Sequence, residues 1–454
     1  MFVKNISQCH LDKLRASWMM YRVPNELAGG PRPGPTAVLD PRISALSAVL
    51  DLVRSGRAGT RSEVERLTGL GRKIVAQRVT ELVDAGLLDE SSLGPSTGGR
   101  APRRLHFVAD AGYVLVAHYG ATGMTAAVTD LAGRPVARER RTHRISDGPE
   151  PALALAFDLW DGLLAAAGTG RPVWGVGIAV PGPVEFSTAR PVSPPIMPGW
   201  HEYPIRQRVQ ERHPVPVWVD NDVNAMALGE LRVGEAHGEN DFIYVKIGTG
   251  IGAGVVSRGR MHHGAQGVAG DVGHIAIREH MGVICRCGKT DCLEAVAGGG
   301  ALITQATQAA ERTESALLAQ RLKDRGQLTV SDLAYAAAHG DPMTVALLSR
   351  SGRLVGEMLA SIVNFFNPSL IIIGGQVAEA GDILLAGVRQ TVYERSLPLA
   401  TRDLRILRSM DSELVSVTGS AFTTIDELFS PGVLQRWIDT GSPVGRTQLP
   451  SPAH

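Results

Sequence analysis

The chain has 454 residues, of which 44% are hydrophobic and 20% are charged, and its formal net charge is +1 at pH 7. This composition is typical of a globular protein with two or three domains. The near-neutral charge of the whole chain indicates neither a nucleic-acid partner nor its absence, so any basic surface must be local. No apolar run approaches the roughly 20 residues of a membrane-spanning helix, and we therefore expect a soluble, cytoplasmic protein with no membrane partner.

Both ends of the chain are predicted to lack regular structure. Residues 1–40 contain Pro24 and the run Gly29–Pro35 and show little periodicity, which predicts a disordered extension. A wrongly assigned start codon would explain this composition equally well. Residues 431–454 include Gly441–Pro443 and Pro450–Pro452 and are expected to form a loose tail.

Three short helices are predicted between residues 41 and 107. Ile43 to Val53 carry one apolar face, Thr60–Glu63 is a capping box that begins a second helix, and a third begins at Arg72 and closes at Gly86. The second and third helices are joined by the turn Gly69–Gly71, which is the helix-turn-helix arrangement. The apolar residues expected to face inward on these two helices are Val64, Leu67, Val75, Val79, Leu82 and Val83.

A glycine-turned hairpin follows at residues 96–107 and is interpreted as the wing of a winged helix-turn-helix. The segment 41–107 is locally basic, with eleven Lys and Arg against seven Asp and Glu. Arginine and glutamine at the front of the third helix can read base edges, and arginines on the wing can contact phosphates. The residues predicted to bind DNA are Arg72, Lys73, Gln77 and Arg78 on the helix, and Arg100, Arg103 and Arg104 on the wing. A small trihelical unit with solvated arginines is the alternative.

From residue 108 to about 430 the pattern is α/β, with glycine-punctuated strands alternating with helices. The strands are expected at Tyr113–Tyr119, Thr125–Asp130, Val173–Val180, Val215–Val219, Phe242–Ile247, Gly252–Val256 and Leu370–Ile373. The helices are expected at Pro151–Ala166, Val223–Leu231 and Pro342–Phe366. Two sheet-bearing lobes with a cleft between them would fit this length.

Three of the four cysteines and one histidine lie within a window of nineteen residues. The spacing His274-x10-Cys285-x-Cys287-x4-Cys292 offers three thiolates and an imidazole, which form a closed tetrahedral shell for Zn²⁺. A disulfide with a bystander thiol is the alternative, but the N-terminus has no apolar signal core and an odd trio pairs badly. A catalytic zinc is not expected, because four protein ligands leave no position for water.

The run Gly264–His274, taken with Cys285, Cys287, Cys292 and Glu294, closely resembles the signature of the ROK family of repressors, open reading frames and sugar kinases. Further matching motifs stand at Val180–Pro183, Pro198–Trp200, Asp220–Ala225, Gly248–Gly254 and Ile373–Gly375. The resemblance covers about residues 43–428. It implies a two-lobed actin-like domain at 108–430, which in the repressors of the family follows a winged helix-turn-helix such as the one predicted at 41–107.

The resemblance also implies a sugar site. In the family, the residues matching Asn221 and Asp222 bind sugar hydroxyls, and in the kinases the aspartate is the general base. Asp271, His274 and Glu294 match the remaining sugar-binding positions, and His274 is expected to hold zinc while lying against the sugar. Asp271 stands where the family has glutamate, which shortens the reach by one methylene.

A second departure separates sensing from catalysis. Actin-like sugar kinases place Mg²⁺ and ATP with an Asp-x-Gly-x-Thr loop, whereas His118 stands at the position of that aspartate. Because Mg²⁺ prefers oxygen ligands, we expect neither ATP nor Mg²⁺ and a structural zinc as the cofactor. The glycine-rich loop with Gly248, Thr249, Gly250 and Gly252 is retained, but such turns also serve packing.

We therefore predict a sugar-responsive transcriptional repressor that binds operator DNA and a sugar or sugar phosphate, and that assembles as a homodimer or homotetramer. The alternative is an ATP-dependent hexose or N-acetylhexosamine kinase, with Asp222 as its catalytic base.

Overall fold

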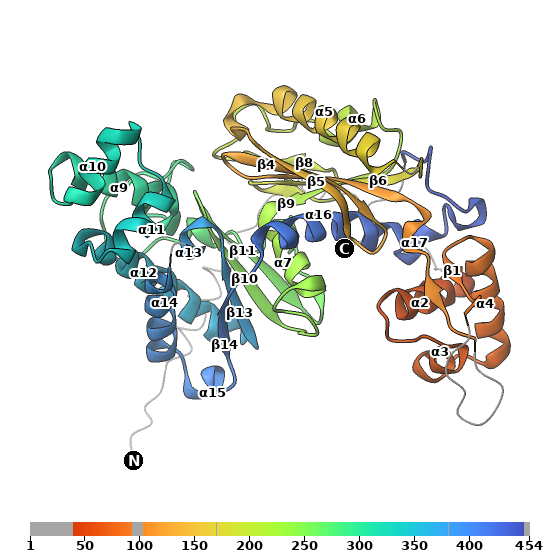
Figure 1. Cartoon of the computed structure of the whole chain (residues 1–454). Helices are drawn as coiled ribbons and strands as arrows, with labels where there is room; N and C mark the ends of the chain where they lie inside the picture. The colour runs from red at the N-terminus through yellow and green to blue at the C-terminus, as the bar shows by residue number, and fades with distance from the viewer. Residues whose placement is uncertain (1–39, 93–102, 169, 380, 449–454) are drawn as a thin grey trace, which may run out of the picture. The chain divides into compact units, whose positions relative to one another are not determined.

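The computed structural model describes residues 40–92, 103–168, 170–379 and 381–448 (Figure 1). The expected disordered extension at 1–40 lies outside this part of the chain except for Asp40. The described helices do not include one that is both long enough and apolar enough to cross a membrane.

The chain begins with three helices and a short antiparallel ribbon. The helices are α2 (Pro41–Arg54), α3 (Arg61–Thr68) and α4 (Arg72–Asp84), and the ribbon pairs β1 (Leu88–Asp89) with β2 (His106–Phe107). Thr60 caps α3 by accepting from the Glu63 N–H, and Glu63 in turn accepts from the N–H of Gly59. The predicted capping box therefore begins α3 with its two reciprocal hydrogen bonds, although Glu63 reaches one residue further back.

Two predicted core positions of this region are exposed. Leu67 is 44% exposed and Val83 is 36% exposed, so the expectation that both face inward is wrong. Val64, Val75, Val79 and Leu82 are buried as expected. Leu67 and Val83 lie near the ends of short helices, where fewer neighbouring elements are available to cover them.

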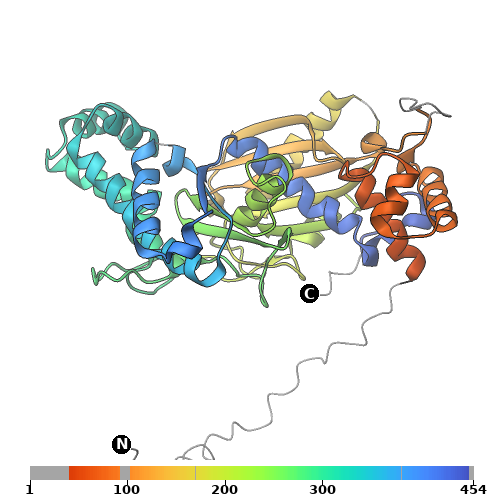
Figure 2. The same cartoon turned by 90° about the horizontal axis from the view of Figure 1, so that it is seen from below.

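Two five-stranded sheets with the same topology follow (Figures 1 and 2). In the first, the strand order is β5–β4–β3–β6–β9, and in the second it is β12–β11–β10–β13–β14. In each sheet the first three strands in sequence form an antiparallel meander, the fourth pairs in parallel with the first, and the fifth pairs in parallel with the fourth. The repetition confirms the two expected sheet-bearing units.

The strands of the first sheet are β3 (Tyr113–Tyr119), β4 (Gly123–Asp130), β5 (Pro135–Thr142), β6 (Val173–Val180) and β9 (Val217–Asn221). Helix α5 (Pro149–Ala167) packs on one face of this sheet, and α16 (Ser412–Leu428) packs against β3 and β6. Figure 2 shows α16, in blue, lying along these strands. The strands of the second sheet are β10 (Phe242–Ile247), β11 (Ile251–Ser257), β12 (Arg260–Met261), β13 (Leu370–Gly374) and β14 (Arg405–Arg408).

Helices cover both faces of the second sheet, and successive side chains of each strand point to opposite faces, so side chains are buried on both sides. Ile243 and Ile371 pack in the core formed with α12 (Pro342–Phe366) and α14 (Asp382–Arg395), whereas Tyr244 and Ile372 pack against α7 (Asp222–Val233). The remaining helices are α6 (Ile205–Gln210), α8 (Leu293–Ala297), α9 (Gly299–Glu311), α10 (Ala316–Arg325), α11 (Val330–Ala338), α13 (Gln376–Glu379), α15 (Pro398–Thr401) and α17 (Pro431–Leu434).

The segment after residue 430 is packed, so the expected loose tail is wrong as far as residue 448. Trp437 is 1% exposed, its ring meets Trp174 edge-on at 5.4 Å, and its indole N–H donates to the carbonyl of Leu428 at 3.0 Å. Val433 and Leu434 are buried in the same cluster, which also contains the core of α2 and α4. Pro431 begins α17, and Gly441, in the left-handed conformation, ends the short 3-10 helix Ile438–Thr440.

Candidate functional site

A cavity of about 300 Å³ lies where the carboxyl ends of the parallel strands of both sheets meet. His118 on β3, Asn221 at the end of β9 and Lys246 on β10 line it, and so do loop residues after β6 and β13. Ligands bind at this edge of α/β sheets because the strands end there and the loops are free to vary. Each residue of the predicted sugar site lines this cavity: Asn221, Asp222, Asp271, His274 and Glu294.

Asn221 and Asp222 form the junction between β9 and α7. The Asn221 side chain caps α7, because its Oδ1 accepts from the N–H of Val223 at 2.8 Å, and its Nδ2 donates to the carbonyl of Gly182 at 3.0 Å. Asp222 is the first residue of the helix and its side chain is 4% exposed. These two bonds therefore hold the Asn221 side chain at the cavity wall in a fixed orientation, next to Asp222.

Lys246 is a cavity residue that the sequence did not predict. Its ammonium group forms an ion pair with the Asp222 carboxylate, and its side chain is 22% exposed. A charged residue inside the apolar strand Phe242–Ile247 was the available signal. The ammonium group occupies Asp222 Oδ2, so a sugar hydroxyl at this carboxylate would share it with Lys246.

His118 is buried and neutral. Ser420 Oγ donates to the carbonyl of Ser416 at 2.7 Å, so His118 Nδ1 must donate to Ser420 Oγ, which lies 3.1 Å away. This leaves Nε2 as a hydrogen-bond acceptor. Burial, and then the positive charges of Lys246 and Arg140, lower the pKa of His118 to about 3. The position where kinases carry a metal-placing aspartate thus holds an uncharged group.

Asp271, His274 and Glu294 approach the cavity from the second sheet. Asp271 Oδ1 lies 3.9 Å from His274 Nε2, and Glu294 Oε2 accepts from the N–H of Ile251 at 3.1 Å. A side chain at Gly250 would collide with Glu294, because a Cβ there would lie 2.0 Å from Glu294 Oε2. Glu294 could move aside. A Cβ on Gly254, however, would lie 2.6 Å from Ala227 Cβ and 2.9 Å from the carbonyl oxygen of Val223, so packing requires this glycine whatever the loop at 248–254 binds.

The other predicted phosphate-loop residues also line the cavity, namely Gly248, Thr249 and Gly252. A Cβ on Gly252 would lie 3.1 Å from Val223 on α7, so this glycine permits close packing of β11 against the helix.

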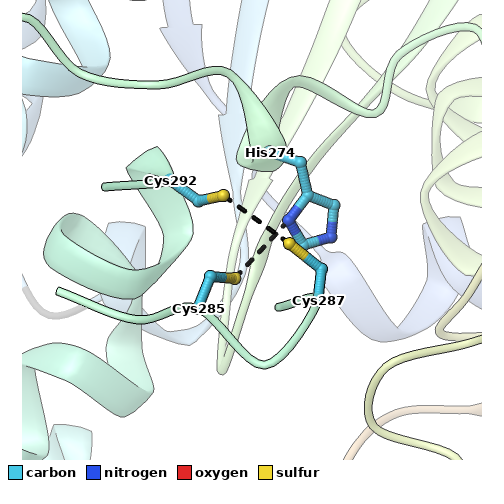
Figure 3. Close-up of side chains that lie close together, drawn as sticks. All are labelled: His274, Cys285, Cys287 and Cys292. Atoms are coloured by element: carbon cyan, nitrogen blue, oxygen red, sulfur yellow. Dashed lines mark hydrogen bonds between the residues drawn. The ribbon is translucent and has the colours of Figure 1, made fainter. Parts of the chain in front are cut away.

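His274, Cys285, Cys287 and Cys292 form a compact cluster (Figure 3). Cys287 Sγ lies 3.7 Å from Cys292 Sγ, and Cys285 Sγ lies 3.6 Å from His274 Nδ1. Zinc–sulfur bonds of about 2.3 Å in a tetrahedron place two sulfurs about 3.8 Å apart. The donor set and its spacing therefore fit a zinc ion, and the three cysteines are free thiols.

Two carboxylates hold the loop that carries this cluster. Asp291 accepts from the N–H groups of Val283 at 2.8 Å and Met281 at 3.2 Å, and despite partial burial these bonds lower its pKa, the bond from Val283 most. Glu279 binds Arg350 at 2.7 Å and Arg353 at 2.6 Å, which ties the loop to α12. The loop is thereby positioned from both sides of the cluster.

Asp220 supports the sugar-site junction from behind and was also missed. Its carboxylate accepts from the N–H of Asn221 at 2.7 Å and from Nδ2 of Asn224 at 2.9 Å, and its other oxygen pairs with His263 Nε2 at 2.8 Å. Burial opposes protonation of His263, but the charge of Asp220 and this hydrogen bond raise its pKa overall. The β9–α7 junction is thus braced by a residue from the loop at 262–274.

The basic face of α4 differs from the prediction at one residue. Arg72, Lys73 and Gln77 are exposed, whereas Arg78 is 6% exposed and pairs with Glu81 at 2.9 Å. The expectation that Arg78 faces outward is therefore wrong, because it lies one position from Gln77 and the helix turns it inward. Arg103 and Arg104 are exposed before β2, and Arg100 lies outside the described residues.

The chain is similar to known proteins in both sequence and structure. Residues 115–424 match the ROK family. The xylose repressor of Caldicellulosiruptor bescii is 29% identical over 390 residues, which cover 84% of this chain and 95% of that protein. A glucokinase of Halalkalibacterium halodurans is 35% identical over 224 residues, which cover 49% of this chain and 68% of that protein.

Among solved structures, a ROK family transcriptional regulator, a homologue of the MLC protein of E. coli, superposes with a TM-score of 0.75 and 26% identity. The superposition covers 88% of this chain and 99% of that one. The family domain, the duplicated sheets and the His/Cys cluster thus agree, and the chain belongs to the ROK family.

Proposed function

We propose that this chain is a sugar-responsive transcriptional repressor. The proposal rests on how much of the chain each relative matches. The match to a xylose repressor covers most of the chain, including residues outside the family domain. The match to a glucokinase covers about half of it. The structural match to a transcriptional regulator is equally extensive.

In this proposal, residues 41–107 form a winged helix-turn-helix that binds operator DNA. The turn between α3 and α4 contains Gly69 in the left-handed conformation, and α4 presents Arg72, Lys73 and Gln77 to solvent from its N-terminal half. The ribbon β1–β2, with Arg103 and Arg104 beside it, has the place of a wing. Arginine and lysine supply phosphate contacts, and Gln77 supplies a base-reading amide.

The effector is a sugar or a sugar phosphate bound in the cavity. Asn221, Asp222, Asp271 and Glu294 offer amide and carboxylate groups that match a ring of hydroxyls. His274 would hold a structural zinc ion through Nδ1, together with Cys285, Cys287 and Cys292, while its ring lines the same cavity. Bound zinc would fix the loop that presents Asp271, and it would contribute folding free energy directly.

The alternative, an ATP-dependent hexose or N-acetylhexosamine kinase, draws support from the glucokinase similarity and from the retained loop at 248–254. Two features of the cavity argue against it. Asp222, the would-be general base, is paired with Lys246, and the neutral His118 stands where a metal-placing aspartate is needed. We therefore propose no enzymatic activity and no role for ATP or Mg²⁺.

A repressor of this kind would act in the cytoplasm. It would assemble as a homodimer or homotetramer, because winged-helix regulators usually read two half-sites.

The decisive experiment combines ligand screening with DNA binding. Purified full chain is screened by thermal shift against hexoses, xylose, N-acetylhexosamines and their phosphates, and DNA affinity is then measured with and without each sugar that binds. A sugar that binds, that changes DNA affinity and that is not phosphorylated with Mg-ATP is the expected result. Robust formation of a phosphorylated sugar would establish the kinase instead.

A further inference from the structure

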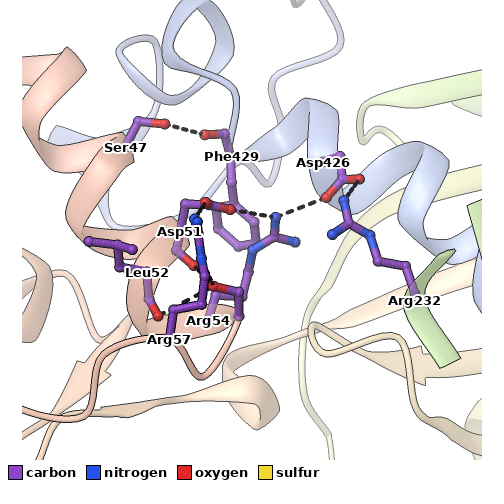
Figure 4. Close-up of polar contacts among 9 residues, drawn as sticks. Ser47, Asp51, Leu52, Arg54, Arg57, Arg232, Asp426 and Phe429 are labelled. Atoms are coloured by element: carbon purple, nitrogen blue, oxygen red, sulfur yellow. Dashed lines mark hydrogen bonds and ion pairs between the residues drawn. The ribbon is translucent and has the colours of Figure 1, made fainter. Parts of the chain in front are cut away.

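One carboxylate, Asp426, is shared by two arginines from different parts of the chain (Figure 4). Its Oδ1 binds Arg54 Nη2 on α2 at 2.9 Å, and its Oδ2 binds Arg232 Nη2 on α7 at 2.5 Å. The side chains of Asp426 and Arg232 are 28% and 31% exposed, and that of Arg54 only 10%. The pair is therefore partly shielded from water, where ion pairs count for more than at the open surface.

The two arginines also share an aromatic ring. The guanidinium carbon of Arg232 lies 4.9 Å from the centre of Phe422, and that of Arg54 lies 5.8 Å from the same ring and 5.6 Å from Phe429. Two cations thus converge on one carboxylate and one ring, so a change at either arginine alters the electrostatic environment of the other.

Two nitrogen atoms of the junction lack a hydrogen-bond partner among the residues that the structure describes, and Arg54 has a second carboxylate within reach. Within the described part of the chain, the buried Arg54 Nη1 and Arg232 Nε have no hydrogen-bond partner. Arg54 Nη2 also lies 3.5 Å from Asp51 Oδ1 on its own helix. If Arg54 leaves Asp426 it can therefore keep its ion pair with Asp51, which also binds Arg57 at 2.7 Å, so the guanidinium has a partner in both arrangements of a two-state contact.

Helix α7 connects this junction to the effector cavity. Asn221 caps the helix and Asp222 begins it, both at the cavity wall, and Arg232 lies in its last turn. Its 12 residues span about 18 Å. A displacement at the cavity end is thus delivered to Arg232 by one rigid element.

Helix α7 is in direct backbone contact with α16, the helix that carries Asp426. A Cβ on Gly229 would lie 2.0 Å from the carbonyl oxygen of Val415, and a Cβ on Gly419 would lie 1.7 Å from that of Ala225. Backbones this close cannot tilt independently, so α7 moves along α16 or together with it.

We propose that the Arg54–Asp426–Arg232 junction transmits effector occupancy to the DNA-binding helices, and this rests on the proposed function of a sugar-responsive DNA-binding protein. Sugar contacts at Asn221 and Asp222 shift α7. The shift of α7 weakens or strengthens the ion pair between Arg232 and Asp426. The Arg54 side chain responds by moving toward Asp426 or toward Asp51. The orientation of α2, and with it α3 and α4, follows Arg54.

The test measures the factor by which a sugar changes operator affinity. The operator is a duplex selected from a random DNA pool by the full wild-type chain, and the probes are D-xylose, D-glucose, N-acetyl-D-glucosamine and their phosphates. For wild type we expect a factor in the range of about 5 to 150. Asp426→Asn and Arg232→Gln, tested separately because either could impair folding, should reduce this factor toward one, while sugar affinity measured by calorimetry stays close to that of wild type.

Asp439→Asn is the matched control. Asp439 pairs with Arg42 at 2.8 Å, so it also joins α2 to the C-terminal region, but through an exposed carboxylate that does not contact α7. This variant should keep the wild-type factor. Hydrogen exchange should show sugar-dependent protection of α2 in wild type and in Asp439→Asn, but not in Asp426→Asn.

The outcomes distinguish the two proposals. Folded Asp426→Asn and Arg232→Gln proteins that retain the wild-type factor would overturn the junction and leave the repressor intact. A wild-type chain that binds no DNA, or whose operator affinity no sugar changes, would overturn the proposed function and the junction together.

Discussion

At the scale of single residues, adjacent positions on α4 have opposite roles. Gln77 is exposed on the helix that is proposed to enter the major groove, whereas Arg78 is buried against Glu81. Glu81 also binds Arg42 Nε at 3.0 Å, so Arg78 belongs to the packing between α4 and α2. Sequence neighbours thus divide between recognition and stability because the helix turns by about 100° per residue.

Gln77→Ala and Arg78→Ala should therefore differ in kind. Gln77→Ala should leave the unfolding midpoint unchanged and weaken binding to the selected operator by ~1–3 kcal/mol, with little effect on random DNA. Arg78→Ala should lower the free energy of unfolding by ~1–3 kcal/mol, because Glu81 loses a partly buried partner, and should keep operator preference. Denaturant titration and fluorescence anisotropy on both duplexes measure the two effects. Equal loss of operator preference in both variants would show that the exposed face of α4 is not the reading face.

At the scale of elements, two segments that lack a core of their own are held by specific interactions. The loop at 274–292 depends on the His/Cys cluster, and the segment at 431–448 depends on Trp437. We therefore predict that the loss of either interaction lowers the stability of the protein.

Replacing one cysteine of the cluster should release the metal and destabilise the protein. Cys285→Ser should reduce zinc from about one ion per chain to a small fraction and lower the melting temperature, because metal binding is coupled to folding of the loop. Sugar affinity should fall with it, since His274 lines the cavity. Elemental analysis and differential scanning calorimetry provide the readouts, with Cys9→Ser as the thiol control. Well-folded wild-type protein without metal would contradict the assignment.

Truncating Trp437 should destabilise the core that it shares with the N-terminal helices. Trp437→Ala removes a side chain that packs on Trp174 and Phe429, and large-to-small changes of this kind cost about 3–5 kcal/mol. Chemical denaturation should show this loss, and hydrogen exchange should increase in α2, whose buried residues lie in the same cluster. If deletion of residues 431–454 left the unfolding free energy unchanged, the C-terminal segment would not be part of this core.

At the scale of the whole molecule, one half-buried carboxyl on α16, that of Glu427, lies near charged groups from two other parts of the chain. Burial, and then the charge of Asp426, raises the pKa of Glu427 to about 7, and Asp220 and His263 face the same region. Glu427 Oε2 is buried and has no hydrogen-bond partner among the described residues. The protonated form of this carboxyl is therefore favoured in the folded chain.

The contribution of Glu427 to stability should consequently fall as pH rises between 4.5 and about 7, whereas His118, whose pKa is lowered from 6.5 to about 3, acts in the opposite direction below 6.5. In this window the folded carboxyl retains its proton while the unfolded one has lost it, so folding takes up a proton and becomes less favourable at higher pH. The raised pKa of His263 acts in the same direction. Urea unfolding of wild type and Glu427→Gln from about pH 5 to about pH 8 tests this, since the free energy of unfolding of wild type relative to that of the variant should fall as pH rises. An identical slope in both proteins would exclude Glu427 as a source of the dependence.

The sequence by itself was sufficient for features with local causes. The helix at 342–366, the strand at 242–247 and the His/Cys spacing are recognisable because periodicity and ligand spacing act within one segment. Other elements were missed for an equally physical reason. Strand β5 is rich in charge because it lies at a sheet edge, and α16 is rich in Thr, Ser and Gly because it packs against α7 and the first sheet.

Only the tertiary structure decided which distant residues meet. Lys246 on β10 pairs with Asp222 on α7, His263 pairs with Asp220, and Arg54 meets Asp426 across 372 positions of sequence. Nothing in the local pattern of either partner records these contacts, because an ion pair depends on where two elements pack and the chain between them imposes no spacing. The sequence therefore determined the family, the cluster and the residues expected to bind sugar, while folding decided which charged side chains pair and which buried groups change their protonation.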